Sequence, residues 1–249
     1  MSIYADIADK LRQDIRQGIY KEGDKLPTEQ QLAEVFGVNR HTLRQAIALL
    51  RTDGLVRVEQ GRGTFVASAP IRYAIGQRVR YNEALKSHGL IAESKFLRAV
   101  QIPSPDAVAI ALEIQPGDPV AIVDRLAFAN HEPISISSGY FPLARFPDFL
   151  SDINQSRLQR LGSVSQFLQQ TFNCDHIRRQ TKVSARTVKT QDARLLALPL
   201  NQPILLAESI NVNQNNIVIE YGVTRFRGDC MELVFDNDIP SAAPWRPTE

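Results

Sequence analysis

The sequence predicts an α+β protein composed of two unlike domains. Within 26–66, apolar residues recur at helical spacing in two short segments, and a glycine-tipped pair of short strands follows them. Much of the remaining chain alternates apolar and polar residues in long runs, as antiparallel strands with one buried face do. A chain of 249 residues has room for two modest domains. We therefore predict a first domain at 1–67, a linker at 68–76 and a second domain at 77–241.

Capping residues mark the two short helices of the first domain. Thr28 and Gln31 have the spacing of a capping box, in which each side chain accepts a hydrogen bond from the other residue's backbone N–H. Asn39 stands at the N-cap position of the next helix, and Gly54 can adopt the left-handed conformation that ends it. The apolar stripe of this second helix consists of Leu43, Ala46, Ile47 and Leu50. Only 37–39 separates the helices, so they form a helix-turn-helix, whose second helix enters the major groove of DNA.

Two short strands complete this domain. They are predicted at 55–58 and 64–66, with a tight turn at 60–63 between them. A preceding helix at 4–18 packs behind the pair of helices through an apolar stripe, which makes the whole a winged helix-turn-helix. The alternative is a small helical core with a surface hairpin that binds nothing.

The order of residues in this domain favours DNA binding over that alternative. From Leu26 onward it runs LPTE…LA..FGVNR.TLR.A...L...G.V....GRGTFV. This order closely resembles the DNA-binding domain of the GntR family of bacterial transcription regulators. The resemblance implies that double-stranded operator DNA is a partner of the first domain.

Charge is distributed as a DNA-binding domain requires, although the net charge of the chain is only +2. Residues 39–63 hold five arginines against two acids, whereas 1–38 hold five basic residues against seven acids. Arginine forms its best base contact with guanine O6 and N7, and helix starts and glycine turns allow close approach to phosphates and to the minor groove. The predicted DNA-binding residues are Gln30, Asn39, Arg40, His41, Arg44, Gly61 and Arg62.

The second domain is predicted to be an antiparallel sheet with a few helices. We expect helices at 78–88, 106–112, 164–172 and 191–197, and strands at 92–102, 120–128, 134–141, 177–188, 204–212, 217–227 and 231–235. The last of these strands is expected to close the sheet. The segment 68–75 is expected to be mobile, because it joins two differently patterned domains with few large apolar residues.

Several stretches of this domain resemble the HutC-type branch of the GntR family. They include Glu132-Pro133-Ile134, Tyr140-Phe141-Pro142 and Ile219-Glu220-Tyr221. The resemblance implies an effector-binding domain of the chorismate-lyase-like (UTRA) type. Residues 78–85 and 178–186 further resemble the regulators of phosphonate-utilisation operons. The sugar-phosphate-sensing relatives tend to have Ser, Arg and an acid at the positions of Arg80, Ala127 and Ser137.

A small phosphonate or phosphate-like anion needs charge-assisted donors that converge on one oxyanion, and the arginine fork suits that geometry. We expect Arg80, Arg125 and Ser163 around the anion, and Glu220 and Tyr140 at an amine or hydroxyl of the other end. Arg225 also stands where the resemblance implies a ligand pocket. The alternatives are a surface salt bridge for each arginine and a helix cap for Ser163. The alternative effector is a sugar phosphate or another small organic acid.

Other classes of function are less consistent with the sequence. No motif of a hydrolase, zinc protease or nucleotide-binding loop occurs, so an enzyme is not predicted. Cys174 and Cys230 form no C-x-x-C pair, and we predict no metal and no cofactor. No apolar run reaches the ~20 residues of a membrane span, and the N-terminus lacks a signal-peptide pattern, which predicts a cytoplasmic protein. A DNA-binding structural protein would not need so large a second domain.

One recognition helix reads few base pairs, so we expect a homodimer that binds an inverted-repeat operator. Exposed strands of the second domain are the expected dimer surface. The family resemblance favours repression over activation.

Overall fold

The computed structural model describes residues 2–59, 61–67, 70–77 and 91–235. It divides into two compact units, Met1–Pro70 and Ile71–Glu249. Within the described part of the chain, no helix combines the length and the apolar character needed to span a membrane. The predicted boundary at 67 is close to the observed one, but the predicted linker is wrong in part, because Ile71–Ala74 forms a strand of the second unit.

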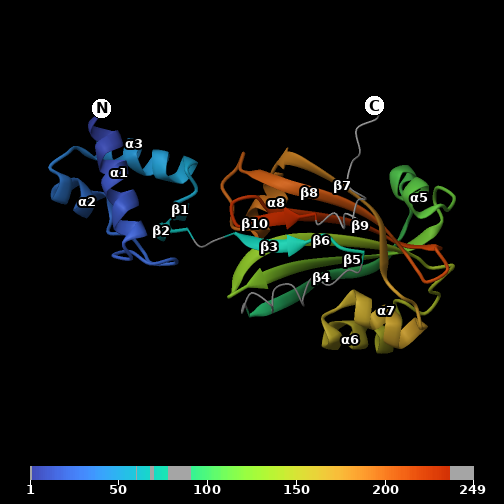
Figure 1. Ribbon diagram of the computed structural model, residues 1–249. Coiled ribbons are helices and arrows are strands. Elements are labelled where there is room, and N and C mark those ends of the chain that lie inside the picture. Colours follow the sequence, from blue (N-terminus) through green and yellow to red (C-terminus); the bar gives the residue numbers. More distant parts are fainter. Residues whose placement is uncertain (1, 60, 68–69, 78–90, 236–249) are drawn as a thin grey trace, which may run out of the picture. The chain divides into compact units, whose positions relative to one another are not determined.

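The first unit is the expected winged helix-turn-helix (Figure 1). Its elements are α1 (Ile3–Arg16), α2 (Glu29–Phe36), α3 (Arg40–Thr52), β1 (Val56–Glu59) and β2 (Gly63–Val66). The predicted stripe of α3, from Leu43 to Leu50, is buried against Ile7, Ala8 and Leu11 of α1. Burial of this apolar face supplies the stability that helices of this length lack by themselves.

The predicted caps of α2 and α3 are confirmed. Thr28 and Gln31 form the reciprocal capping box, and Gly37 ends α2 with φ +64°. The side chain of Asn39 accepts a hydrogen bond of 2.8 Å from the Thr42 N–H. Because Gly37 and Asn39 lie in the turn between the helices, they fix the direction in which α3 leaves α2.

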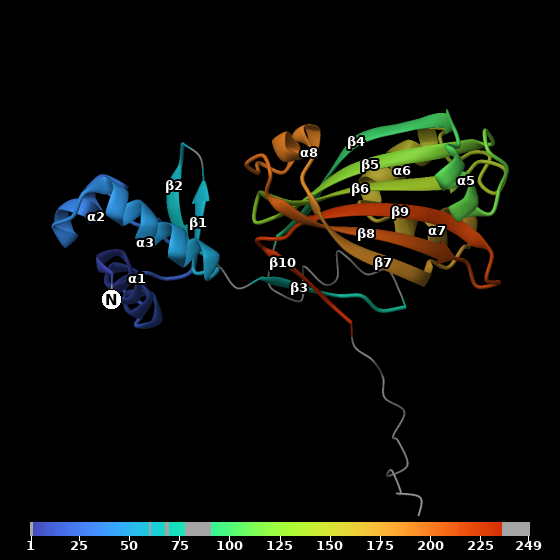
Figure 2. The same cartoon turned by 90° about the horizontal axis from the view of Figure 1, so that it is seen from above.

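The second unit contains a six-stranded antiparallel sheet with the order β4-β5-β6-β9-β8-β7 (Figures 1 and 2). The strands are β4 (Ala92–Pro103), β5 (Pro119–Ala129), β6 (Glu132–Pro142), β7 (Ile177–Thr187), β8 (Pro203–Val212) and β9 (Val218–Arg227). The turn between β5 and β6 consists of Asn130 and His131, both with positive φ. The turn lies at the surface, where the His131 imidazole is 2.8 Å from Glu93.

Different elements cover the two faces of this sheet. One face packs against α6 (Asp152–Leu161) and α7 (Val164–Phe172) and, farther along, against the pair β3 (Ile71–Ala74) and β10 (Met231–Val234). The opposite face packs against α5 (Asp106–Leu112) and α8 (Thr190–Leu195). We call these the α7 face and the α5 face.

Two features of this unit differ from the expectations. The strand at 231–234 does not close the large sheet; it pairs in parallel with β3, so that Tyr73 faces Leu233 in the register. Helix α6 was not expected. The helix expected at 78–88 lies outside the described residues. Cys174 and Cys230 are not joined in a disulfide.

Candidate DNA-binding surface and effector pocket

The N-terminal end of α3 presents three exposed side chains that the sequence selected, Arg40, His41 and Arg44. Two contacts with α2 orient the arginines. Arg40 Nη2 donates to Gln30 Oε1 at 2.7 Å, and Arg44 Nε donates to Glu29 Oε2 at 2.7 Å. These side chains lie on the exposed side of α3, opposite its buried stripe, where they are available to another molecule.

The wing between β1 and β2 is similarly exposed. Gly61, at its tip, adopts φ +76°, a conformation that costs other residues free energy. The guanidinium of Arg62 lies 5.7 Å from the centre of the Phe65 ring, and that of Arg57 lies 5.5 Å from it. The aromatic ring therefore holds two positive charges beside the glycine tip. All seven predicted DNA-binding residues are exposed on the first unit.

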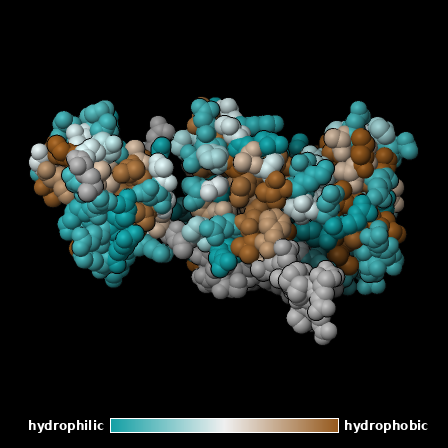
Figure 3. Space-filling model, turned by 45° about the horizontal axis from the view of Figure 1, so that its top comes forward, coloured by the Kyte–Doolittle hydropathy of each residue, from teal (hydrophilic) through white to brown (hydrophobic). Residues whose placement is uncertain are grey.

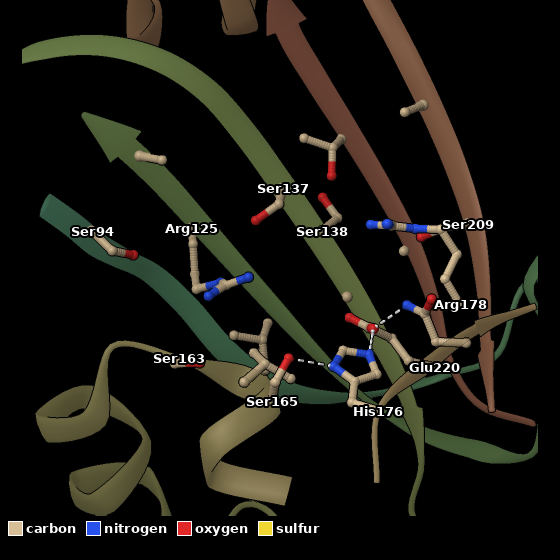
Figure 4. Close-up of a pocket in the computed structure, with 18 of the residues that line it drawn as sticks. Ser94, Arg125, Ser137, Ser138, Ser163, Ser165, His176, Arg178, Ser209 and Glu220 are labelled. Atoms are coloured by element: carbon tan, nitrogen blue, oxygen red, sulfur yellow. Dashed lines mark hydrogen bonds and ion pairs between the residues drawn. The ribbon is translucent and has the colours of Figure 1, made fainter. Parts of the chain in front are cut away.

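A cavity of about 430 Å³ opens on the α7 face of the sheet. Its walls come from β5, β6, β8 and β9, from β3, from the start of α7 and from the start of β7. Volumes of this order accommodate small metabolites. Figure 4 shows Arg125 and Arg178 on opposite sides of this pocket, with His176 and Glu220 between them.

The structure brings together three of the six predicted effector-binding residues. Arg125, Ser163 and Glu220 all line the pocket. Ser163 is also the N-cap of α7 and accepts a hydrogen bond of 3.4 Å from the Gln166 N–H, so the capping interpretation holds as well. Arg80 lies outside the described residues.

The expectation that Tyr140 and Arg225 belong to the same site is wrong. Both side chains lie on the α5 face. Tyr140 stacks on Tyr221 with ring centroids 5.9 Å apart. Arg225 lies 3.4 Å from Asp192 of α8 and donates to Ser138 Oγ at 3.2 Å. The sheet itself separates these groups from the pocket.

Glu220 is the centre of a buried polar network in the pocket floor. Its Oε2 lies 2.6 Å from His176 Nε2 and accepts a hydrogen bond of 2.6 Å from Asn211 Nδ2. The other imidazole nitrogen of His176, Nδ1, is 2.8 Å from Ser165 Oγ. Glu220, His176 and Asn211 are each less than 10% exposed. Two strands, β8 and β9, and the segment before β7 thus meet in one network.

Charge balance keeps Glu220 ionised. Burial by itself raises the pKa of its carboxyl group. Electrostatic attraction to His176, hydrogen bonds from His176 and Asn211, and the positive charge of Arg125 outweigh burial and hold this pKa below its ordinary value. Gly139 leaves the necessary space, since a Cβ there would lie 2.6 Å from Glu220 Oε1. The pocket therefore presents a fixed negative charge opposite the Arg125 side.

Sequence reasoning missed the residues that complete the pocket. The most informative are Arg178, Thr181 and Asn211, because each has a buried polar atom with no hydrogen-bond partner among the described residues. These atoms are Arg178 Nε, Thr181 Oγ1 and Asn211 Oδ1. Buried polar atoms are rarely left without a partner unless a ligand or water supplies one. Arg178 and Thr181 lie within the stretch 178–186 that resembles regulators of phosphonate-utilisation operons, but nothing in that stretch singles them out, and no motif contains Asn211.

The series Ser165–His176–Glu220 contains the residue types of a hydrolytic triad. In this pocket, however, the Ser165 hydroxyl lies at Nδ1 of His176 and the Glu220 carboxylate at Nε2, the reverse of the order in that triad, and Asn211 also binds the carboxylate. The arrangement fixes Glu220 as a hydrogen-bond acceptor for a bound molecule. Donors on one side and this acceptor on the other can bind a small molecule with an anionic end and an amine or hydroxyl.

Comparison with known proteins agrees with both halves of this description. The model of the family described as bacterial regulatory proteins, gntR family, matches residues 3–66, and the model of the UTRA domain matches residues 87–232. The chain belongs to the gntR family of bacterial regulators and carries a UTRA domain. Members of this family are transcription regulators that bind operator DNA.

Individual relatives cover nearly the whole chain. The probable transcriptional regulator PhnF of Escherichia coli (strain K12) is 34% identical over 94% of this chain and 95% of its own length. The mannosyl-D-glycerate transport/metabolism system repressor MngR of the same strain is 30% identical over 91% of this chain and 92% of its own. The crystal structure of PhnF from Mycobacterium smegmatis has a TM-score of 0.63 at 24% identity, covers 96% of this chain and 100% of its own, and shows the shared fold.

Proposed function

We propose that this protein is a repressor that releases its operator when a small anionic effector, a phosphonate or a phosphate-like molecule, binds the pocket of the UTRA domain. The observation that carries the proposal is the composition of the pocket, in which Arg125 and Arg178 enter from opposite sides above a buried carboxylate. Guanidinium groups bind phosphonate and phosphate oxygens in a bidentate fashion.

Three serines extend the anion-binding side. Ser94, Ser137 and Ser163 line the pocket with Arg125, and their hydroxyl groups can donate to an oxyanion. Opposite them, Glu220 suits an amine or hydroxyl on the other end of the ligand. We propose that Ser163 both caps α7 and contacts the anion, because the N–H groups at a helix start favour negative charge.

Resemblance favours phosphonates among the possible anions. Residues 178–186 resemble regulators of phosphonate-utilisation operons, and 178 and 181 of this stretch line the pocket. A sugar phosphate or a small organic acid is the second candidate, which the similarity to the mannosyl-D-glycerate system repressor favours. Both classes of effector would contact the same charged side chains of the pocket. They differ in the middle of the molecule, between the anionic end and the amine or hydroxyl.

A screen by thermal shift tests the effector and separates these candidates. Methylphosphonate, 2-aminoethylphosphonate, inorganic phosphate, sugar phosphates and urocanate are each added to the full chain. We expect a phosphonate to raise the melting temperature by several degrees, because a ligand at about 100 times its Kd stabilises by ~2.7 kcal/mol. Arg125→Ala should lose this shift. The matched control is Arg98→Ala, since Arg98 lies on the neighbouring strand but pairs with Asp124 at 2.8–2.9 Å outside the pocket.

The outcomes are distinguishable. A shift by sugar phosphates alone supports the second candidate. An equal shift in the wild type and Arg125→Ala, or no shift by any anion, contradicts the proposed pocket.

On the DNA side, we propose that two copies bind an inverted repeat through α3 and the wing. The face of the second unit seen in Figure 3 exposes hydrophobic side chains in several places, and we propose that a second copy binds through such side chains. Val100 is 40% exposed although it lies on β4. Sedimentation at micromolar concentration should give a dimer, and nuclease protection should give a palindromic footprint. A monomer with an asymmetric footprint contradicts this arrangement.

A further inference from the structure

Arg178 connects the pocket to the first strand of the second unit. Its Nη1 donates to the carbonyl oxygen of Gly76 at 2.8 Å, and its Nη2 donates to the Tyr73 hydroxyl at 3.2 Å. Its backbone N–H donates to the carbonyl oxygen of Gln77 at 2.6 Å. Three hydrogen bonds from one residue thus hold the segment 73–77 against the start of β7.

This segment has two further properties. It follows within a few residues of Pro70, the last residue of the DNA-binding unit, so the chain passes from that unit directly into β3. It is also part of the pocket wall, because Tyr73 and Ile75 line the cavity. Tyr73 is 4% exposed and packs on Phe226, with ring centroids 5.9 Å apart. The strand that leads out of the DNA-binding unit is therefore in position to respond to a ligand.

The guanidinium of Arg178 has hydrogen-bonding capacity that these contacts do not use. Its Nε is buried and has no partner among the described residues, and the nearby pocket atoms Thr181 Oγ1 and Asn211 Oδ1 share this property. A phosphonate oxygen is a stronger acceptor than a carbonyl or a phenol, because its charge assists the hydrogen bond. Such an oxygen competes with Gly76 and Tyr73 for the same guanidinium.

We propose that Arg178 is the switch residue of the pocket: it clasps segment 73–77 in the unliganded protein and turns to the anionic effector when one binds, which releases the strand that leads to the DNA-binding unit. This inference rests on the proposed function and adds its mechanism. The effector and the segment 73–77 compete for one guanidinium, so binding of either partner by Arg178 weakens binding of the other. This reciprocity couples effector binding in the pocket to operator binding by the first unit.

Tyr73→Phe gives the sharpest test, since it removes one acceptor of the clasp and keeps the ring. The DNA is a duplex that the wild type selects from a random library, and the small molecule is the phosphonate or phosphate with the lowest Kd by calorimetry. We expect Tyr73→Phe to bind that anion at least threefold more tightly than the wild type, because the competing acceptor is gone. We also expect the ratio of duplex affinities without and with the anion to fall at least threefold.

Two other variants complete the experiment. Arg178→Gln should weaken anion binding at least tenfold. Arg179→Gln is the matched control, because Arg179 is the adjacent arginine but pairs with Glu113 at 2.5 Å at the surface, and it should leave both quantities unchanged. Melting curves confirm that each variant is folded.

The results separate the switch from the proposed function. If the wild type binds an anion and Tyr73→Phe changes neither its Kd nor the affinity ratio, Arg178 is not the switch, although the effector pocket stands. An unchanged anion Kd in folded Arg178→Gln also overturns the switch. If no anion binds the wild type, both proposals fail.

Discussion

Replacement of Glu220 by alanine is expected to lower the free energy of unfolding of the second unit by about 2–6 kcal/mol, because each of two buried polar side chains is left without its partner at a cost of ~1–3 kcal/mol. The carboxylate holds both His176 and Asn211, each 4% exposed or less. Without it, the His176 imidazole and the Asn211 amide lose their acceptor in a buried environment. Urea denaturation followed by circular dichroism measures the effect.

The chain contains a matched control for this substitution. Glu93 and His131 form the same pair of residue types at 2.8 Å, with side chains 45% and 74% exposed. Exposed pairs contribute ~0–1 kcal/mol, so Glu93→Ala should change the stability little. Similar losses in the two variants would show that the buried network does not support the fold.

The dependence of stability on pH follows from the same network around Glu220. The pKa of Glu220 is held below its ordinary value of 4.5, so its ionised form stabilises the native state fully above about pH 4.5. That contribution is lost as the pH falls through the lowered pKa. Glu220→Gln removes this titration, and its stability should therefore fall less steeply with acid than that of the wild type. If the wild type and Glu220→Gln lose stability equally as the pH falls, this assignment is contradicted.

The elements that the sequence predicts well are those with local signals. The helices at 106–112 and 164–172 have the predicted bounds, since apolar spacing defines them and a residue with left-handed conformation, Glu113 or Asn173, follows each. The strands of the large sheet are correct to within a residue or two because their alternation reflects one buried face. The pair β3 and β10 has no such signal: each strand has four residues, and their partners are distant in the sequence.

The incorrect predictions of pocket residues have different causes. Glu220 and Arg225 are five positions apart on one strand, and alternation places residues at odd spacing on opposite faces, so the sequence itself argued against grouping them. Arg178 is a different case. A register shift between Arg178 and Gln180 places Arg178 on the same face as Thr181, and such a bulge cannot be read from alternation.

The second prediction with a large expected effect concerns the affinity for DNA. Arg44→Ala is expected to weaken binding to the selected duplex by about 1–3 kcal/mol, roughly 5- to 150-fold, as loss of an arginine–guanine contact does. Arg44 is 67% exposed on the outer side of α3, and Glu29 orients its guanidinium at 2.7 Å. We therefore expect Glu29→Gln, which keeps the length and removes the charge, to alter the base preference at the position that Arg44 contacts.

Arg51→Ala provides the control, because Arg51 is an exposed arginine in the last turn of the same helix and lies away from the end that enters the groove. Fluorescence anisotropy at several salt concentrations distinguishes two kinds of contact. If Arg44 binds a base, the affinity for the selected duplex falls much more than that for random DNA. If Arg44 binds a phosphate, the affinities for the selected duplex and for random DNA fall together. The slope of the logarithm of the binding constant against the logarithm of the salt concentration then decreases in magnitude by about one. Unchanged affinity for the selected duplex in Arg44→Ala would contradict the placement of α3 in the major groove.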